Sequence, residues 1–280
     1  METLTDRAGL AGYLGVRGGC VLVPTMGALH AGHGSLIRRG AEEASRRGLG
    51  GGCVVSVFVN PTQFDDPSDY ARYPKTLGAD EALAREAGAS AVWAPGVEEV
   101  YPPGEEVGVP ELPAEATGPG LEDARRPGHF AGVCRVVKRL FEVVGPAAAV
   151  FGEKDYQQLR VVASMVRGLG MGVEVIAGAT VREADGLAMS SRNRFLKAEE
   201  RGRAGALWRA LVRARGEGTV SGAERVMREE VEGAGLLVEY AVVRDAAGLM
   251  PMSGGRGRGF GRALIAARLG SVRLIDNAAW

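Results

Sequence analysis

Along the first part of the chain, short strand-like apolar runs alternate with stretches whose apolar residues recur with the period of a helix. Short apolar runs rich in β-branched residues occur at residues 20–23, 53–59, 91–93, 149–151 and 173–176. Between them lie stretches of helical period at 33–47, 76–87, 130–144 and 155–168. This alternation predicts a parallel sheet with helices on both faces. The run at 54–59 is almost continuously apolar, as expected of a strand buried on both sides.

The pattern changes beyond about Thr180. Helical stretches near 198–215 and 221–234 are followed by strand-like runs near 236–243, 263–267 and 272–275. We therefore predict an α/β domain of residues 1–179 and a smaller C-terminal α+β domain of residues 180–280. Residues 98–124 are rich in Pro, Gly and Glu and have no clear period, which predicts a long loop, either a lid or a plain surface excursion.

Composition narrows the class of protein. With 280 residues, 46% hydrophobic and 24% charged, the chain is typical of globular proteins rather than disordered or disulfide-stapled ones. Basic and acidic residues number 34 each, so we expect no nucleic-acid partner, because polyanion binding needs a surplus of cations. The cysteines have no metal-ligand spacing and are expected to be buried thiols. With no membrane-length apolar run and no leader pattern, we expect a cytoplasmic protein without a membrane partner.

The rare polar residues cluster beside predicted strand ends, where open α/β sheets bind ligands. In residues 21–37, a strand and a turn containing Pro24 and Gly27 precede His30 and His33, which open a helix. A helix N-terminus presents unpaired N–H groups, and two imidazoles at this spacing can face one anion, which favours a triphosphate. Half of a metal site or an ordinary helix cap are the alternatives, although no third nitrogen or sulfur ligand lies nearby.

The His-x-Gly-His spacing after a strand resembles the signature of the nucleotidylyltransferase superfamily, whose members bind ATP with the α-phosphate open to attack. The second signature of that superfamily, a Lys-Met-Ser-Lys-Ser-like loop, is similar to residues 188–193. Arg192 stands there where a lysine is frequent and would supply a fork of donors to phosphate oxygens. The resemblance implies a Rossmann-like parallel sheet for the larger domain, with a C-terminal lid domain.

Longer segments narrow the resemblance to one family. They are PTMGALHAGH (24–33), FVNPTQFDDPSDYARYPKT (58–76), RPGHFAGV (126–133), FGEKDYQQL (151–159), READGLAMSSRN (182–193) and RLIDN (273–277). In this order they are similar to the pantothenate synthetase (pantoate–beta-alanine ligase) family over nearly the whole chain. The resemblance implies a ligase of pantothenate and coenzyme A biosynthesis that joins D-pantoate to beta-alanine with ATP, releasing AMP and pyrophosphate through a pantoyl-adenylate. It also implies a homodimer and a magnesium ion beside the triphosphate.

The same resemblance assigns residues to roles. As catalytic groups it implies His30, His33, Lys154 and Arg192, which would stabilise negative charge on the departing pyrophosphate. An imidazole with a pKa near 6.5 at His33 can donate either a hydrogen bond or a proton. The ATP-binding residues that it implies are Met26, Gly27, Ala28, Leu29, His30, Ala31, Gly32, His33, Gly152, Glu153, Lys154, Asp155, Val181, Met189, Ser190, Ser191 and Arg192.

Neutral amides suit pantoate, since they read its hydroxyls and carboxylate without a net cationic pocket. Gln63 and Gln158 match the pantoate-binding glutamines of the family, and Gln63 is also linked to beta-alanine. Asn60 is a further candidate, with a turn cap after the strand as the alternative. Asp155 has the alternative role of a helix N-cap. Asp80 is a weak candidate for steering magnesium, with an exposed helix aspartate as the alternative.

Two other functions remain open at this level. A nucleotidylyltransferase that transfers AMP or CMP to a phosphorylated acceptor would need a basic cluster in place of Gln63 and Gln158. A catalytically silent nucleotide-binding module would be expected to lack His33, Lys154 or Arg192, and all of these are present.

Overall fold

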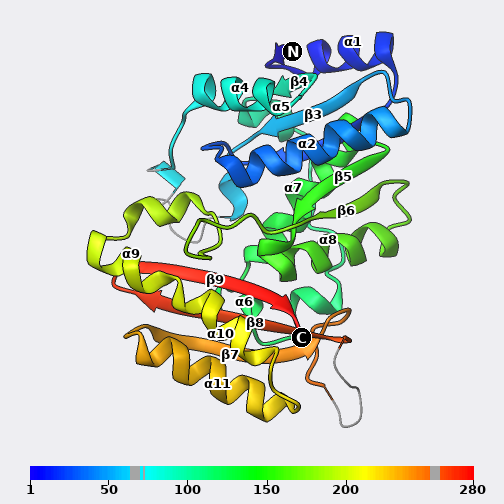
Figure 1. Cartoon of the computed structure of the whole chain (residues 1–280). Coiled ribbons are helices and arrows are strands. Elements are labelled where there is room, and N and C mark those ends of the chain that lie inside the picture. Colours follow the sequence, from blue (N-terminus) through cyan, green and yellow to red (C-terminus); the bar gives the residue numbers. More distant parts are fainter. Residues whose placement is uncertain (64–69, 72, 253–258) are drawn as a thin grey trace.

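The computed structural model describes residues 1–63, 70–71, 73–252 and 259–280, which form two sheets with their helices (Figure 1). The larger sheet is parallel, and its strand order is β1-β4-β3-β2-β5-β6. Its strands are β1 (Glu2–Leu4), β2 (Cys20–Thr25), β3 (Gly52–Val57), β4 (Ala91–Trp93), β5 (Ala148–Gly152) and β6 (Glu174–Gly178). The order reverses between β2 and β5, and parallel sheets form a ligand crevice at the carboxyl ends of such strands.

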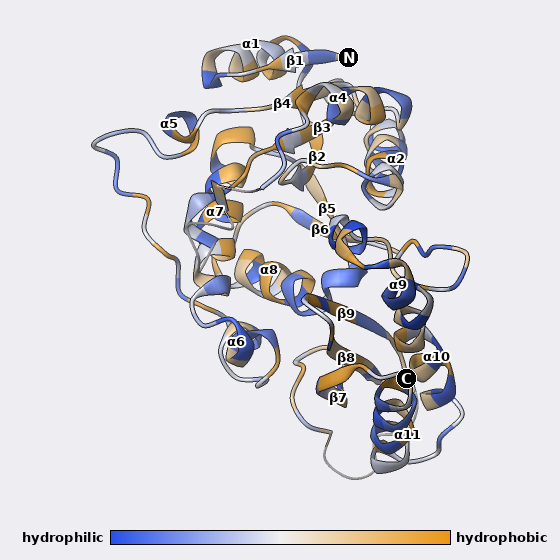
Figure 2. Ribbon diagram, turned by 90° about the vertical axis from the view of Figure 1, so that its left-hand side faces the viewer, coloured by the Kyte–Doolittle hydropathy of each residue, from blue (hydrophilic) through white to orange (hydrophobic). Residues whose placement is uncertain are grey.

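Helices cover both faces of this sheet, as the alternating pattern predicts. Successive residues of β2 point to opposite faces. Val21 and Val23 pack with Ile37 on one side, while Leu22 packs with Phe141 on the other. The first side is covered by α2 (Ala31–Arg46) and α4 (Leu77–Glu86), and the second by α1 (Arg7–Arg17), α7 (His129–Val144) and α8 (Tyr156–Gly168). Apolar residues are concentrated in β3 and on α7 (Figure 2).

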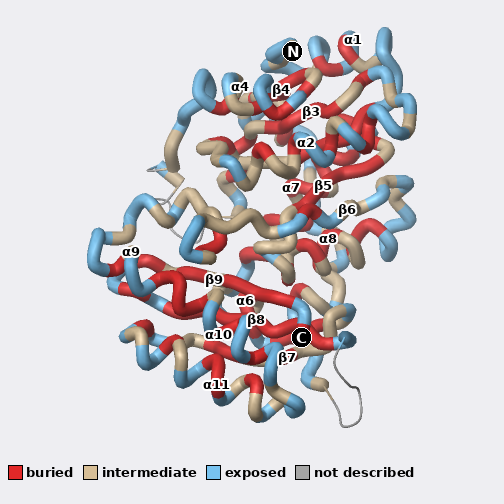
Figure 3. Tube along the Cα trace, viewed as in Figure 1, coloured by how far each residue is buried: buried red, intermediate tan, exposed pale blue. Residues whose placement is uncertain are grey.

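The predicted C-terminal α+β unit is confirmed. Strands β7 (Leu237–Asp245), β8 (Gly261–Leu269) and β9 (Val272–Ala279) form an antiparallel sheet in that order. One face packs on α10 (Ala206–Ala214) and α11 (Val220–Gly233), with Leu211, Met227 and Ile265 fully buried between them. The helix expected at 198–215 is divided, because α9 (Ala198–Ala204) ends just before Gly205. Strands β3, β5 and β8 are buried along most of their length (Figure 3).

Two N-terminal elements were not predicted. Strand β1 and helix α1 precede β2, so the strand that the sequence places first is the second in the chain. With three residues, β1 is too short to show a period, and it lies at the sheet edge beside β4. Helix α1 contains glycines and buries only Leu10 and Tyr13, which leaves a weak helical signal.

The long segment at 98–124 contains only short helices and packs against the larger domain. It contains the short helices η2 (Ala114–Ala116) and the start of α6 (Glu122–Arg125), after α5 (Val97–Val100). Gln157 on α8 accepts a hydrogen bond from the Glu122 N–H (2.8 Å) and donates to the Glu115 carbonyl (2.9 Å). Gln157 therefore fastens this segment to the body of the larger domain.

A buried ion pair ties the smaller sheet to α6 of the larger domain. Arg273 on β9 donates two hydrogen bonds of 2.7 Å to Glu122, and Tyr240 on β7 donates a third of 2.7 Å. Arg273 also donates to Glu239 (2.8 Å). Only 8% of Glu122 is exposed, so its charge depends on these partners. The predicted domain boundary at residue 179 falls in the connection that follows β6 and stays a prediction.

Two simpler expectations can be checked directly. Cys20, Cys53 and Cys134 are free, buried thiols, as predicted. Among the described residues, none of the helices combines the length and the apolar character needed to cross a bilayer.

Replacing Glu122 tests the tie between α6 and the smaller sheet. Glu122→Ala leaves the Arg273 guanidinium with Glu239 alone and the buried Tyr240 hydroxyl without its acceptor. We expect the free energy of unfolding to fall by about 3 kcal/mol in denaturant titrations. As the matched control, Glu229→Ala removes an exposed ion pair with Arg225 on α11 and should leave stability nearly unchanged. Equal stability of the two variants would contradict this account.

Candidate active site

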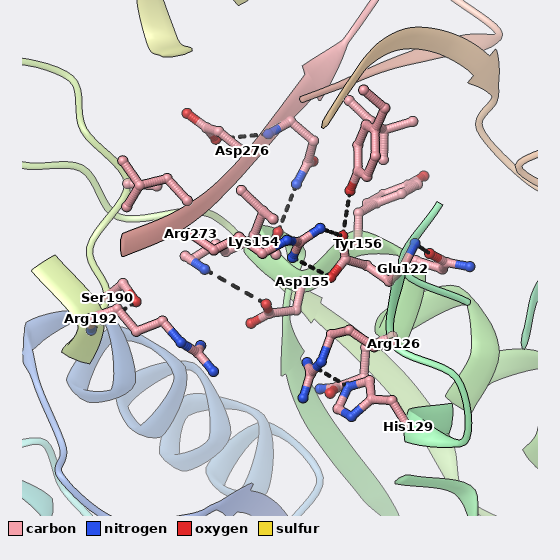
Figure 4. A pocket seen from close by; sticks show the side chains of 18 of the residues that line it. Glu122, Arg126, His129, Lys154, Asp155, Tyr156, Ser190, Arg192, Arg273 and Asp276 are labelled. Carbon is pink, nitrogen blue, oxygen red and sulfur yellow. Dashed lines mark hydrogen bonds and ion pairs between the residues drawn. The ribbon is translucent and has the colours of Figure 1, made fainter. Parts of the chain in front are cut away.

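A cleft opens where the carboxyl ends of β2 and β5 face the segment that links the two sheets. It consists of two adjoining cavities of about 270 Å³ and 290 Å³. The first is lined by the loop after β2, the start of α2, the turn after β5 and residues 179–181 and 189–192. The second reaches β9 of the smaller sheet (Figure 4). Residues that line both cavities are Arg126, His129, Lys154, Asp155, Gln158, Ser190 and Arg192.

The two histidines form a reciprocal cap at the start of α2. The Gly32 N–H donates to Nδ1 of His30 (3.1 Å), and the His30 N–H donates to Nδ1 of His33 (3.3 Å). The alternative of a helix cap is therefore correct. Because Nδ1 accepts in both rings, a neutral ring carries its proton on Nε2, which leaves that N–H as a donor. A Cβ at Gly32 would lie 2.8 Å from the His30 ring, so the glycine between the histidines permits this arrangement.

Both imidazoles are held in their neutral form. Burial, followed by the charges of His30 and Lys154, lowers the pKa of His33 to about 3, although Asp155 opposes the shift. Burial and then Lys154 also lower the pKa of His30. Burial thus moves both imidazoles below the expected pKa near 6.5. At neutral pH, His33 offers a hydrogen bond rather than a ready proton.

Lys154 and Asp155 lie side by side in the cleft. The turn η3 (Glu153–Asp155) follows β5 and places Nζ of Lys154 3.6 Å from Oδ1 of Asp155 (Figure 4). Burial raises the pKa of Asp155, but Lys154 and then Arg192 outweigh it, so the net pKa is lowered. Asp155 occupies the N-cap position of α8 without accepting a cap hydrogen bond, so the N-cap alternative fails for its side chain. Its carboxylate instead supplies negative charge to a cluster of cations.

Arg192 follows a hairpin formed by residues 181–189. Met189 donates to the Val181 carbonyl (2.9 Å), and the Ser190 hydroxyl accepts from the Arg192 N–H (3.2 Å) at the start of η4 (Ser191–Phe195). Asn193 donates to Glu183 (2.7 Å), which fixes the loop to the hairpin. The hairpin thus brings Arg192 to the lining of the same cavity as the two histidines.

Of the three predicted amide residues, Asn60 caps a turn, whereas Gln63 and Gln158 line the first cavity. Asn60 is 1% exposed, and its side chain accepts from the Thr62 N–H (3.2 Å) and donates to Gln63 Oε1 (3.2 Å). The alternative of a turn cap is therefore correct for Asn60. Gln63 and Gln158 both line the first cavity, where Nε2 of Gln63 also donates to the Met26 sulfur (2.7 Å). Residues 64–69 and 72 belong to the segment 58–76, which carries part of the family resemblance, and they lie outside the described residues.

The prediction that Asp80 is an exposed helix aspartate or a carboxylate that steers magnesium needs correction. It is 1% exposed, and its two oxygens accept from the N–H groups of Ala28 (3.2 Å) and Leu29 (2.7 Å). Ala28 has a positive φ of 51°, which is strained for a side-chain residue, so this carboxylate holds the loop in place. Among the described residues, no cluster of three carboxylate, histidine or cysteine ligands gathers anywhere.

Most of the predicted nucleotide residues meet in the first cavity. Its lining includes all four predicted catalytic groups and Met26, Gly32, Gly152, Asp155, Val181, Met189, Ser190 and Ser191. Other predicted residues shape the loop or the turn beside the cavity and are outside its described lining: Gly27, Ala28, Leu29, Ala31 and Glu153.

The sequence reasoning gave no role to Asn277, although it singled out residues 273–277. The structure places Asp276 and Asn277 in the wall of the second cavity. Two adjacent polar residues in a strand that is apolar apart from Arg273 are the signal that could have found them. Thr180 was also missed: its Oγ1 is buried without a partner among the described residues, in the lining of the first cavity.

Comparisons with known proteins show which family the chain is similar to. The family model for pantoate-beta-alanine ligase matches residues 11–279. A pantothenate synthetase from Rubrobacter xylanophilus is 52% identical, covering 92% of this chain and 90% of the relative. Pantothenate synthetase from Thermus thermophilus has a TM-score of 0.89 at 44% identity, covering 100% of this chain and 99% of that one. Pantoate-beta-alanine ligase from Francisella tularensis, complexed with beta-gamma ATP and beta-alanine, has a TM-score of 0.78 at 28% identity, covering 100% and 97%.

The neutral state of His33 can be read by NMR, because the chain has only three histidines. We expect the Cε1–H resonance of His33, assigned with the His33→Gln variant, to stay in its neutral position from about pH 8 to about pH 5. A midpoint near 6.5 would contradict the structure. Since the folded pKa lies below that of the unfolded chain, this residue should also make stability decrease as pH falls from 6.5 toward 3.

Asp80→Asn tests the support of the loop after β2. An amide keeps one acceptor but turns its NH₂ group toward a backbone N–H, so the free energy of unfolding should fall by about 2 kcal/mol. Glu86→Gln, on the exposed end of the same helix, is the matched control and should be neutral. Full stability of Asp80→Asn would mean that these hydrogen bonds do not hold the loop.

Proposed function

Because the chain belongs to the pantoate-beta-alanine ligase family, we propose that its cleft joins D-pantoate to beta-alanine in two steps that use ATP. One observation carries the proposal. His30 and His33 share one segment and Lys154 and Arg192 come from two others, yet all four line a single cavity at the carboxyl ends of β2 and β5. Such a set of donors suits a triphosphate.

In the first step, a carboxylate oxygen of pantoate attacks the α-phosphorus of ATP, and pyrophosphate leaves. Negative charge develops on the leaving group, where each preorganised donor is worth about 3 kcal/mol. Lys154 and Arg192 would supply formal charge there. His30 and His33 would supply Nε2–H hydrogen bonds, since burial keeps them neutral. The product is pantoyl-adenylate, whose acyl carbon is a far better electrophile than a carboxylate.

In the second step, the amine of beta-alanine attacks the acyl carbon, and AMP leaves with the former carboxylate oxygen. Gln63 and Gln158 would hold pantoate through neutral amides. Asn60 would position Gln63, to which it donates (3.2 Å). Amides in this place favour a ligase over transfer of AMP to a phosphorylated acceptor, which would call for cations.

Asp155 would act as a counter-anion in the unliganded site. Its carboxylate faces Lys154, and Arg192 adds to the positive surroundings. A bound triphosphate would compete with it for those groups, so we expect Asp155 to turn away when ATP binds.

The remaining features of the proposal rest on the family resemblance. Magnesium is implied by the triphosphate, but the described residues offer it no carboxylate cluster, and Asp80 uses both oxygens on the loop. The residues present do not fit a protein-held ion, and no step here depends on one. We also propose a cytoplasmic homodimer with domains of residues 1–179 and 180–280, whose closure would keep water from the adenylate.

Exchange of labelled pyrophosphate into ATP tests the two-step reaction. Exchange should require pantoate and proceed without beta-alanine, while release of AMP in the steady state should require both. Lys154→Ala and His33→Ala should each lower exchange by about 100-fold or more with folding unchanged. Lys138→Ala, which removes a lysine from outside the cleft, is the matched control for Lys154. Exchange without pantoate, or wild-type rates in the two variants, would refute the assigned roles.

A further inference from the structure

The turn that carries Lys154 is held by a residue of the smaller sheet. Asn277 on β9 is 3% exposed, and its Nδ2 donates to two backbone carbonyls, those of Glu153 (2.9 Å) and Lys154 (2.8 Å). These contacts cross from the C-terminal sheet to the end of β5 in the larger sheet.

The two carbonyls lie just before the first acceptor of helix α8. Helix α8 begins at Tyr156 with Asp155 at its N-cap, so the carbonyl of Asp155 is the first acceptor of the helical ladder. The carbonyls of Glu153 and Lys154 precede it in a single 3₁₀ turn. A polar backbone group in such a place is costly if it stays unpaired. The Asn277 amide supplies both hydrogen bonds with one NH₂ group.

Asn277 is itself fixed on its acceptor side. Its Oδ1 accepts from Nε of Arg262 (2.7 Å), a residue that is 8% exposed. The Arg262 guanidinium stacks 4.0 Å from the centre of the Tyr156 ring and reaches Glu153 Oε2 (3.2 Å). The donors and the acceptor of the amide are thus all used, which leaves Asn277 one orientation.

We infer that Asn277 is a positioning residue that sets the place of Lys154 in the cleft. The inference rests on the proposed role of Lys154 toward the triphosphate. The side chain of Lys154 starts from the backbone that Asn277 holds, and its Nζ lies among the groups of the cleft. A displacement of about 1 Å in such a group can cost up to about 100-fold in rate. The smaller sheet therefore contributes to adenylation through this turn.

Asn277→Asp is the most selective variant, since it keeps the shape and the oxygen that faces Arg262. It replaces the NH₂ group with an oxygen that repels both carbonyls. We expect kcat for pantoate-dependent pyrophosphate exchange to fall by about 10- to 100-fold. The aminolysis of supplied pantoyl-adenylate by beta-alanine should change much less, because pyrophosphate has already left. Trp280→Phe removes a different hydrogen bond of the same sheet, Nε1 to the Ala214 carbonyl (3.0 Å), and should retain exchange.

A double-mutant cycle separates positioning from general loosening. If Asn277 acts through Lys154, adding Asn277→Asp to Lys154→Ala should change exchange by less than about twofold. Additive losses, or a wild-type rate in Asn277→Asp, would overturn the inference while leaving the proposed function intact. A wild-type rate in Lys154→Ala would instead overturn the proposed function. Asn277→Ala removes the donors without adding charge, and it decides the question in the same way should Asn277→Asp not fold.

Discussion

A triphosphate carries more negative charge than one segment of chain can meet, so its donors have to be gathered from several. In this protein the parallel sheet gathers them, because the reversal of strand order between β2 and β5 brings His30, His33 and Lys154 to one crevice. Arg192 arrives from the hairpin that leads to the second sheet. The Asp155 carboxylate lies among these cations and faces Lys154 at 3.6 Å.

The backbone near His30 and Lys154 is held in place by hydrogen bonds with buried side chains. Asp80 holds the loop before His30 through two backbone N–H groups, and Asn277 holds the turn of Lys154 through two carbonyls. Each is nearly fully buried and comes from a different element than the residue that it serves. The ion pair of Glu122 and Arg273 ties α6 to β9, the strand that reaches the turn. The cleft is therefore preorganised by contacts between elements distant in sequence.

The local period of the sequence predicted the alternating larger sheet and the smaller α+β unit, whereas the convergence of the four donor groups was implied by the resemblance to a known family. The sequence did not predict β1, which is too short to show a period, or the neutral state of His33, which follows from burial in the folded protein. It also misjudged Asp80, since nothing near that residue in sequence reveals that it accepts from Ala28 and Leu29. What remained hidden in each case was a contact with a distant part of the chain.

The most direct measurement is a crystal structure of the protein soaked with ATP and pantoate in the absence of beta-alanine. The account predicts density for pantoyl-adenylate in the cleft, with phosphate oxygens within hydrogen-bond distance of His30, His33, Lys154 and Arg192. It also predicts that the Asp155 carboxylate will have turned away from Lys154. A nucleotide bound elsewhere, or bound with these side chains directed away from its phosphates, would contradict the central claim.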